Sequence, residues 1–210
     1  MEGLASKLPG LGKVCLPTLL LVWSTVAGAG TDGQGAGGRY QEARAFLRNG
    51  QTYARNEQWQ AAIALYRNAI DINPRLADAH FLMGVAYAQQ HRPHASVQAL
   101  KRATQLNPRS ARAFYNLGVA YAYTGNLEQE MAAYKKALRL DPDHISAHYN
   151  LATAYWAKGQ DRQACRNFYE AGRLYERAGQ ERQAGEMLAI IEQVAPQSKF
   201  RHRLAELMRE

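Results

Sequence analysis

Histidines, a cysteine and paired acids are the residues of this chain that would first suggest a reactive site. His91 and His94 flank a predicted turn, and His144 and His148 are four residues apart. Each pair could offer two nitrogens to a metal ion, but neither brings a carboxylate or thiolate at a fitting distance as the third ligand of a zinc site. We therefore expect exposed turn histidines and no bound metal.

The other reactive groups are equally isolated. Cys165 falls at a helix-packing position without an obvious histidine base, which favours a buried thiol over a nucleophile. Glu128 and Glu130 lie on one surface without a pocket. The glycine-rich stretch 28–38 has no strand before it and no Gly-Lys-Ser/Thr after it, so it is a linker and not a phosphate-binding loop. The sequence predicts no catalytic residues, no cofactor and no enzyme.

The elements that would carry any site are helices arranged in repeats. From Arg39 onward apolar residues recur three and four positions apart, which is the helical period. Four columns of residues also recur every 34 positions: Pro74, Pro108 and Pro142; Tyr53, Tyr87, Tyr121 and Tyr155; Gly50, Gly84, Gly118 and Ala152; and Ala69, Ala103, Ala137 and Ala171. The proline ends a helix, because it lacks an N–H and blocks continuation. The small residue lets two helices approach closely, and the tyrosine and alanine fill the space where repeats stack.

This pattern resembles the tetratricopeptide repeat family over about three quarters of the chain. The clearest copy is FYNLGVAYAYTGNLEQEMAAYKKALRLDP, residues 114–142. The resemblance implies an all-α, right-handed superhelical solenoid of helix-turn-helix repeats, in which neighbouring repeats share one core. The expected organisation is a signal peptide or membrane anchor (1–29), a glycine-rich linker (30–38), four repeats in 39–178 (43–76, 77–110, 111–144 and 145–178), and a partial fifth repeat with capping helices (179–210).

Two departures from the pattern carry predictions. Glu130 stands where a small residue is usual, so packing there should be looser or locally polar. Glu176 replaces the fourth proline, and a displaced repeat frame runs through Gly172 to Pro196. We therefore expect the helix over 161–177 to serve two repeats. The last amphipathic segment, 198–210, should cap the stack, with docking onto a partner or membrane as the alternative.

The resemblance also implies which residues face the concave groove formed by the first helices. The predicted partner-binding residues are Phe81, Tyr115, Asn116, Tyr123, Tyr149, Asn150 and Trp156. An amide side chain can donate to and accept from a peptide bond, and aromatic residues supply rigid contact area. The two asparagines form a ladder of only two rungs, which limits the length of peptide that they could hold. A basic clamp for a carboxylate terminus, as in some relatives, is incomplete, because Leu47 and Phe81 occupy positions that need polar groups.

The first 29 residues predict an extracytoplasmic protein. Two lysines precede an apolar run over residues 14–26, and Ala-Gly-Ala follows it, which is the order of a secretory signal peptide. The run is shorter than the roughly 20 residues of a spanning helix. A periplasmic or secreted location is therefore expected, and a membrane anchor over residues 14–29 is the alternative.

Charge and fold together predict a non-enzymatic scaffold for protein partners. The net charge of +8 favours an acidic partner or anionic lipid. No dense Lys/Arg block is present, so nucleic acid is not expected. The predicted partner is an extended or helical protein segment, in assembly of an extracytoplasmic or membrane-associated complex, and self-association is left open. The alternative is a structural subunit that docks through its convex face or its C-terminal helix.

Overall fold

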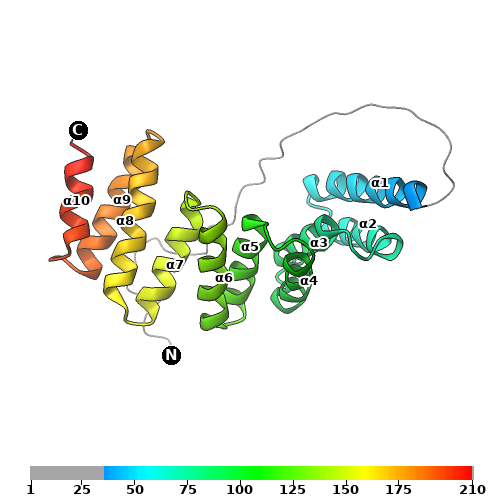
Figure 1. Ribbon diagram of the computed structural model, residues 1–210, viewed down its shortest axis with the longest axis horizontal. Helices are drawn as coiled ribbons and strands as arrows, with labels where there is room; N and C mark the ends of the chain where they lie inside the picture. The colour runs from blue at the N-terminus through cyan, green and yellow to red at the C-terminus, as the bar shows by residue number, and fades with distance from the viewer. Residues whose placement is uncertain (1–35, 210) are drawn as a thin grey trace. The chain divides into compact units, whose positions relative to one another are not determined.

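A computed structural model describes residues 36–209, and within this range the chain forms ten helices and no strand (Figure 1). The helices are α1 (Ala36–Arg55), α2 (Trp59–Ile72), α3 (Ala77–Gln89), α4 (Pro93–Leu106), α5 (Ala111–Tyr123), α6 (Leu127–Leu140), α7 (Ile145–Ala157), α8 (Asp161–Arg177), α9 (Glu181–Val194) and α10 (Lys199–Leu207). This is the predicted all-α repeat fold. The predicted leader lies outside the described residues. The first helix begins at Ala36, so the prediction of a linker is wrong for its last three residues, 36–38.

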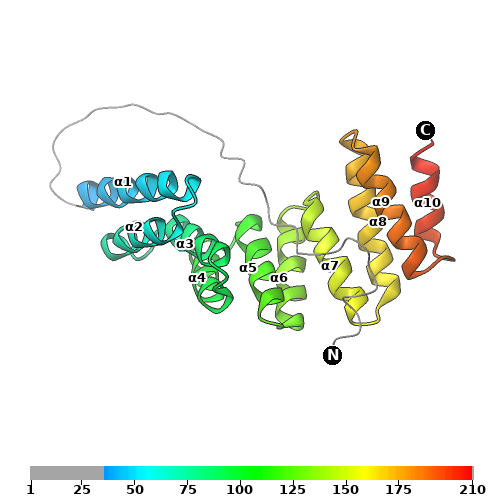
Figure 2. The same cartoon turned by 180° about the vertical axis from the view of Figure 1, so that it is seen from behind.

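The described residues divide into two compact units. The N-terminal unit, residues 36–108, contains α1 to α4. The C-terminal unit, residues 109–209, contains α5 to α10 and has two buried apolar clusters. In each unit consecutive helices pack as pairs and the pairs stack on one another (Figure 2). None of the described helices combines the length and the apolar character needed to cross a membrane.

Prolines end the second helices as the sequence predicts. The helices α2, α4, α6 and α9 each stop two residues before a proline: Pro74, Pro108, Pro142 and Pro196. In α8, where the proline is missing, the helix continues to Arg177. Proline therefore ends these second helices, because it lacks the N–H that the next helical hydrogen bond needs.

Small residues bring the two helices of a repeat together. A Cβ atom added at Gly118 would lie 2.5 Å from Cε1 of Tyr134, and one at Gly50 would lie 2.5 Å from Cε1 of Tyr66. Both tyrosines are fully buried. The predicted reason for the glycine column is confirmed, because any larger residue would displace a buried ring.

The turn inside each repeat uses a left-handed residue that the sequence analysis missed. Glu57, His91, Gly125 and Gly159 are spaced 34 residues apart and have φ values of 57°, 55°, 71° and 71°. In each turn the backbone N–H of the residue after the left-handed one donates to the backbone carbonyl of that repeat's tyrosine. An example is the bond from the Asn126 N–H to the Tyr121 carbonyl. The repeated geometry is therefore held by backbone bonds, and the two glycines at the same spacing were the signal in the sequence.

The C-terminal end confirms the shared helix and the cap. The helix α8 packs against both α7 and α9, and α10 lies beside α8 and α9 (Figures 1 and 2). Leu204 of α10 is fully buried, and a Cβ at Gly172 of α8 would lie 2.6 Å from its Cδ2 atom. The close approach fixes α10 as a cap on the apolar end of the C-terminal unit.

The tyrosine column is only partly in the core. Tyr87 is buried, and its hydroxyl accepts a hydrogen bond of 2.7 Å from Arg67 of the preceding repeat. Tyr155 is half-buried, with the Lys135 ammonium 5.1 Å from its ring centre. Tyr53 is 43% exposed, so its predicted core position is wrong. Among the described residues no earlier repeat precedes α1 to cover it.

Candidate binding site

The predicted groove residues separate into a buried and an accessible set. Phe81 on α3, Tyr115 on α5 and Asn150 on α7 are 8%, 1% and 5% exposed. These three side chains therefore offer little surface to a partner, and their direct contact with one stays a prediction. Their side chains instead fix the positions of the helices that carry the accessible residues.

Tyr115 of α5 is held by residues of α6 and α7. Its ring centre lies 4.6 Å from that of His144 and 5.9 Å from that of Tyr134. Its hydroxyl accepts a hydrogen bond of 3.3 Å from Nδ2 of Asn150. His144 also caps α7, because its Nδ1 accepts from the Ala147 amide at 3.3 Å. This cluster ties α5 to α7 and makes the face between them rigid.

Asn116 and Asn150, the two rungs of the predicted asparagine ladder, do not present their amides in the same way. Asn150 gives its amide to the Tyr115 hydroxyl in the core. Asn116 is half-buried, and its Nδ2 donates 2.9 Å to the Arg112 carbonyl one turn earlier in α5. Only Asn116 therefore presents amide atoms near the surface, and its role in binding stays a prediction.

Three predicted aromatic residues keep accessible surface. Tyr123, at the end of α5, is 45% exposed. Tyr149 is half-buried and meets Phe168 edge to face, with ring centres 5.8 Å apart. Trp156 is half-buried near the end of α7. These side chains stand on two first helices, and they remain candidates for partner contact.

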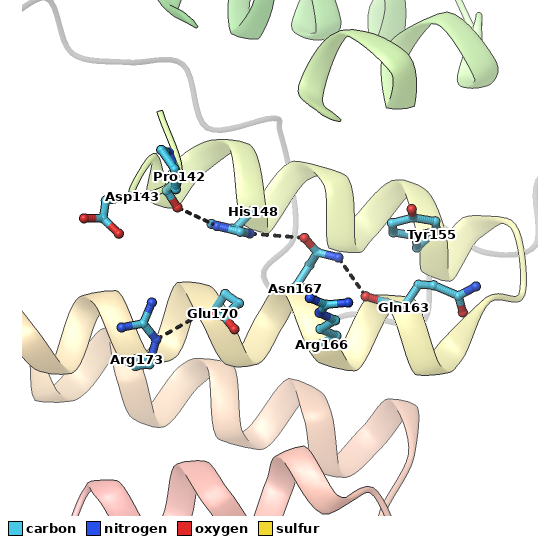
Figure 3. Close-up of a pocket in the computed structure, with 9 residues that line it drawn as sticks. All are labelled: Pro142, Asp143, His148, Tyr155, Gln163, Arg166, Asn167, Glu170 and Arg173. Atoms are coloured by element: carbon cyan, nitrogen blue, oxygen red, sulfur yellow. Dashed lines mark hydrogen bonds and ion pairs between the residues drawn. The ribbon is translucent and has the colours of Figure 1, made fainter. Parts of the chain in front are cut away.

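A polar cleft of about 320 Å³ lies along α7 and α8 (Figure 3). Nε2 of His148 lies 2.9 Å from the Pro142 carbonyl oxygen, and Nδ1 lies 3.1 Å from Oδ1 of Asn167. Asn167 in turn donates 2.9 Å from Nδ2 to the Gln163 carbonyl. Because both ring nitrogens of His148 are engaged, neither serves as a base or a metal ligand.

The ends of the cleft are charged. Nε of Arg173 pairs with Oε2 of Glu170 at 3.0 Å, and Asp143 lies 4.0 Å from Arg177. The first pair is partly buried and the second is exposed. Opposite charges thus pair at these ends of the cleft, whereas Arg166, which also lines it, takes part in no ion pair among the described residues.

The buried ionisable groups lack reactive partners. Burial raises the pKa of the Cys165 thiol, which keeps it protonated, as predicted for an inert buried cysteine. Burial also raises the pKa of Glu130 to about 7. The carboxyl stands where other repeats bury Ala62 or Ala164 completely. Glu130 is half-buried among these packing positions, which agrees with the prediction of locally polar packing there.

Neither histidine pair has a third metal ligand beside it in the described part of the chain. Among residues 36–209 no three His, Cys, Asp or Glu side chains come together to hold a metal ion. His91 and His94 are exposed, as expected. His144 and His148 are half-buried and hydrogen-bonded, so the prediction that they are exposed is wrong. His144 caps the start of α7, where the first amides need acceptors, and His148 braces the preceding turn through the Pro142 carbonyl.

Comparison with protein families identifies the repeats. The family model described as TPR repeat matches residues 50–90, and two described as tetratricopeptide repeat match residues 83–145 and 133–166. Together these matches run without a gap from residue 50 to residue 166. A search of curated proteins gives no match.

Solved structures with a similar fold include proteins named MamA. A crystal structure of MamA is 28% identical, covers 65% of this chain and 80% of its own, and has a TM-score of 0.63. MamA 41-end from Desulfovibrio magneticus RS-1 is 25% identical, covers 65% and 76%, and has a TM-score of 0.61. The first TPR of Spaghetti (RPAP3), bound to the HSP90 peptide SRMEEVD, is 22% identical, covers 57% and 95%, and has a TM-score of 0.56. The last likeness shows the fold alone.

Proposed function

The chain belongs to the tetratricopeptide repeat family, and from this premise we propose that it is a non-enzymatic scaffold that binds a segment of a partner protein. The proposed surface is the face of the C-terminal unit formed by α5 and α7. Its contact residues are Asn116, Tyr123, Tyr149 and Trp156. The buried cluster around Tyr115 holds the two helices in place beneath them.

The observation that carries the proposal is the exposure of Tyr123. The large hydrophobic residues exposed within the described range are Tyr40, Tyr53 and Tyr123, and all lie on α1 or α5, the first helices of their repeats. Tyrosine combines a wide apolar ring with a hydroxyl, which is why it is common in binding hot spots. An exposed tyrosine on a rigid helix pair therefore favours contact with a partner.

The experiment is capture of partners from an extract of the source organism with the full chain as bait. The test variant carries Asn116→Ala, Tyr123→Ala and Trp156→Ala, with unchanged helicity by circular dichroism. A partner identified with the natural chain is then purified, and its affinity for both baits is measured. We expect the variant to bind at least about tenfold more weakly, which corresponds to about 1.4 kcal/mol.

A matched control changes three exposed residues on second helices: Gln98→Ala, Gln129→Ala and Arg139→Ala. This variant should bind the partner as the natural chain does. If the natural chain and the test variant (the groove variant, with Asn116→Ala, Tyr123→Ala and Trp156→Ala) bound the partner with equal affinity, the proposed surface would be rejected. Loss of binding in the control alone would support the alternative, a structural subunit that docks through its convex face.

We propose an extracytoplasmic location for this scaffold, from the order of charged, apolar and small residues in residues 1–29. N-terminal sequencing of the protein isolated from its native source should find a start near residue 30. A start at Met1 in a membrane fraction would instead support an anchor over residues 14–29. A start at Met1 in the soluble cytoplasmic fraction would reject both.

A further inference from the structure

A basic cleft lies between α8 and α10 in the C-terminal unit, separate from the face formed by α5 and α7. It measures about 500 Å³. Four of its lining residues are exposed cations: Arg162, Arg166, Lys199 and Arg203. Glu170 is the carboxylate that also lines it, and this group is already paired with Arg173 at 3.0 Å. The cleft therefore carries four positive charges that its own acid does not balance.

None of the ion pairs formed by the described residues uses these four cations. On α10, Arg201 pairs with Glu192 at 2.8 Å, and on α9 Arg182 pairs with Glu186 at 3.2 Å. Glu192 and Glu186 thus pair with arginines that do not line the cleft. Like charges that share one cleft repel each other, and a bound anionic group would relieve that repulsion.

The floor of the cleft is apolar and fixed. Tyr169 of α8 and Phe200 of α10 are half-buried and meet with ring centres 5.7 Å apart. The Lys199 ammonium lies 5.4 Å from the centre of the Phe200 ring. Beneath them, the packing of Leu204 against Gly172 holds α10 in place. The cations therefore surround a preformed apolar surface, which lowers the ordering cost of binding.

We propose that this cleft binds an extended acidic segment of a protein, with an apolar residue seated on Tyr169 and Phe200 and with Asp or Glu side chains paired to the surrounding cations. From Arg162 to Tyr169 the helix rises about 10 Å, which matches about three extended residues. The rings pack against each other, which leaves them poorly placed for stacking on nucleic-acid bases. A recessed cleft also fits a single chain better than the plane of a membrane.

This inference adds a partner chemistry to the proposed scaffold function but uses different residues, so each can fail without the other. The test measures fluorescence anisotropy of a short labelled peptide of glutamates around one phenylalanine, titrated with the full chain. The cleft variant carries Arg166→Glu and Arg203→Glu. The control carries Lys101→Glu and Arg139→Glu, two exposed cations outside the cleft that change the net charge equally.

We expect the cleft variant to bind the peptide at least about tenfold more weakly than the control, and salt to weaken the binding of the natural chain. A peptide of lysines around one phenylalanine should bind the cleft variant better than it binds the natural chain. This gain keeps the test independent of any loss of folding. Equal losses in the cleft variant and the control would show attraction by net charge only and would overturn the proposal.

Two further probes decide between classes of partner. Vesicles that contain phosphatidylserine and a single-stranded oligonucleotide are titrated under the same conditions. Binding of either probe that depends on Arg166 and Arg203, without such binding of the acidic peptide, would also overturn the proposal. The groove variant with Tyr123→Ala should bind the acidic peptide normally, which separates this site from the proposed groove.

Discussion

The two units build the same turn from different residues. In the N-terminal unit the left-handed position is occupied by Glu57 and His91, and in the C-terminal unit by Gly125 and Gly159. A residue with a Cβ atom pays roughly 1–2 kcal/mol for this conformation, whereas glycine pays almost nothing. All four positions keep the left-handed conformation whatever residue occupies them, so helix packing at the 34-residue spacing determines the turn conformation. The residue at the left-handed position determines only the conformational free energy of that turn.

The units also differ at the small position that begins each second helix. The N-terminal unit has Ala62 and Ser96 there, both fully buried, and the serine hydroxyl has no hydrogen-bond partner. The C-terminal unit has Glu130 and Ala164, and only the alanine is fully buried. Each unit therefore carries one polar residue at a position that packing reserves for alanine, and a serine costs less there than a carboxylate.

The largest expected loss of stability tests a contact that both units share, a buried tyrosine ring packed on a glycine. Tyr66→Ala in the N-terminal unit and Tyr134→Ala in the C-terminal unit each remove a fully buried ring that packs on a glycine. Each should lower the free energy of unfolding by about 3–5 kcal/mol, because the cavity cannot collapse onto a helix backbone. Chemical denaturation gives the total loss, and amide hydrogen exchange shows which helices lose protection.

Phenylalanine at the same two positions is the control, since it keeps the ring and should change stability little. The shared packing would be contradicted if one alanine variant were nearly as stable as its phenylalanine counterpart. That result would mean that one unit does not depend on its glycine contact.

A smaller effect on the free energy of unfolding depends on pH. It arises from Glu130 in the C-terminal unit, at the position where the N-terminal unit has Ala62 and Ser96. Burial raises the pKa of Glu130 from 4.5 to about 7 in the folded protein, so the fold favours the protonated carboxyl. Stability from this group is present below pH 4.5 and is lost as the pH rises through about 7. Glu130→Gln should therefore stabilise the protein at pH 8, by about 2 kcal/mol after allowance for partial exposure, and much less at pH 4.5.

Glu128→Gln is the matched control, two residues away. A hydrogen bond and ion pair with Lys158 lower the pKa of this exposed carboxyl, so its substitution should give no gain at pH 8. Thermal unfolding of both variants across this pH range checks the sign. The same pH dependence in the natural chain and in Glu130→Gln would exclude the buried carboxyl as its source.

The smallest effect sharpens the comparison of turns. Gly125→Ala should cost about 1 kcal/mol, because the alanine must adopt the left-handed conformation. Glu57→Gly and His91→Gly should each stabilise the N-terminal unit by about 0.5–1 kcal/mol, after the added entropy of the unfolded glycine is subtracted. Denaturation midpoints measure all three. A loss of stability on both glycine substitutions would mean that the side chains of Glu57 and His91 support their turns.

Much of the fold could be predicted from the sequence, because prolines and glycines act locally. Pro74, Pro108 and Pro142 give the helix ends, and the Gly118 column gives the close helix contacts. The missing proline at Glu176 predicts the shared helix α8. These features depend on backbone chemistry, which a single sequence displays directly.

The candidate site was predicted less well, because accessibility depends on neighbouring side chains. The repeat frame places Tyr115 and Asn150 on first helices. It does not reveal that the His144 ring packs against Tyr115 or that the Asn150 amide donates to the Tyr115 hydroxyl. Tyr123, two turns further along α5, stays exposed. The basic cleft was missed because its cations come from α8 and α10, far apart in sequence, and no repeat column contains them all.

The most direct test of the proposed scaffold function is hydroxyl-radical footprinting of the full chain with and without its captured partner. Tyr123 in the C-terminal unit and Tyr40 in the N-terminal unit are 45% and 42% exposed, so they should react similarly when the partner is absent. We predict that the partner protects Tyr123 and leaves Tyr40 unchanged. Unchanged oxidation of Tyr123 in the saturated complex would contradict the proposed binding face.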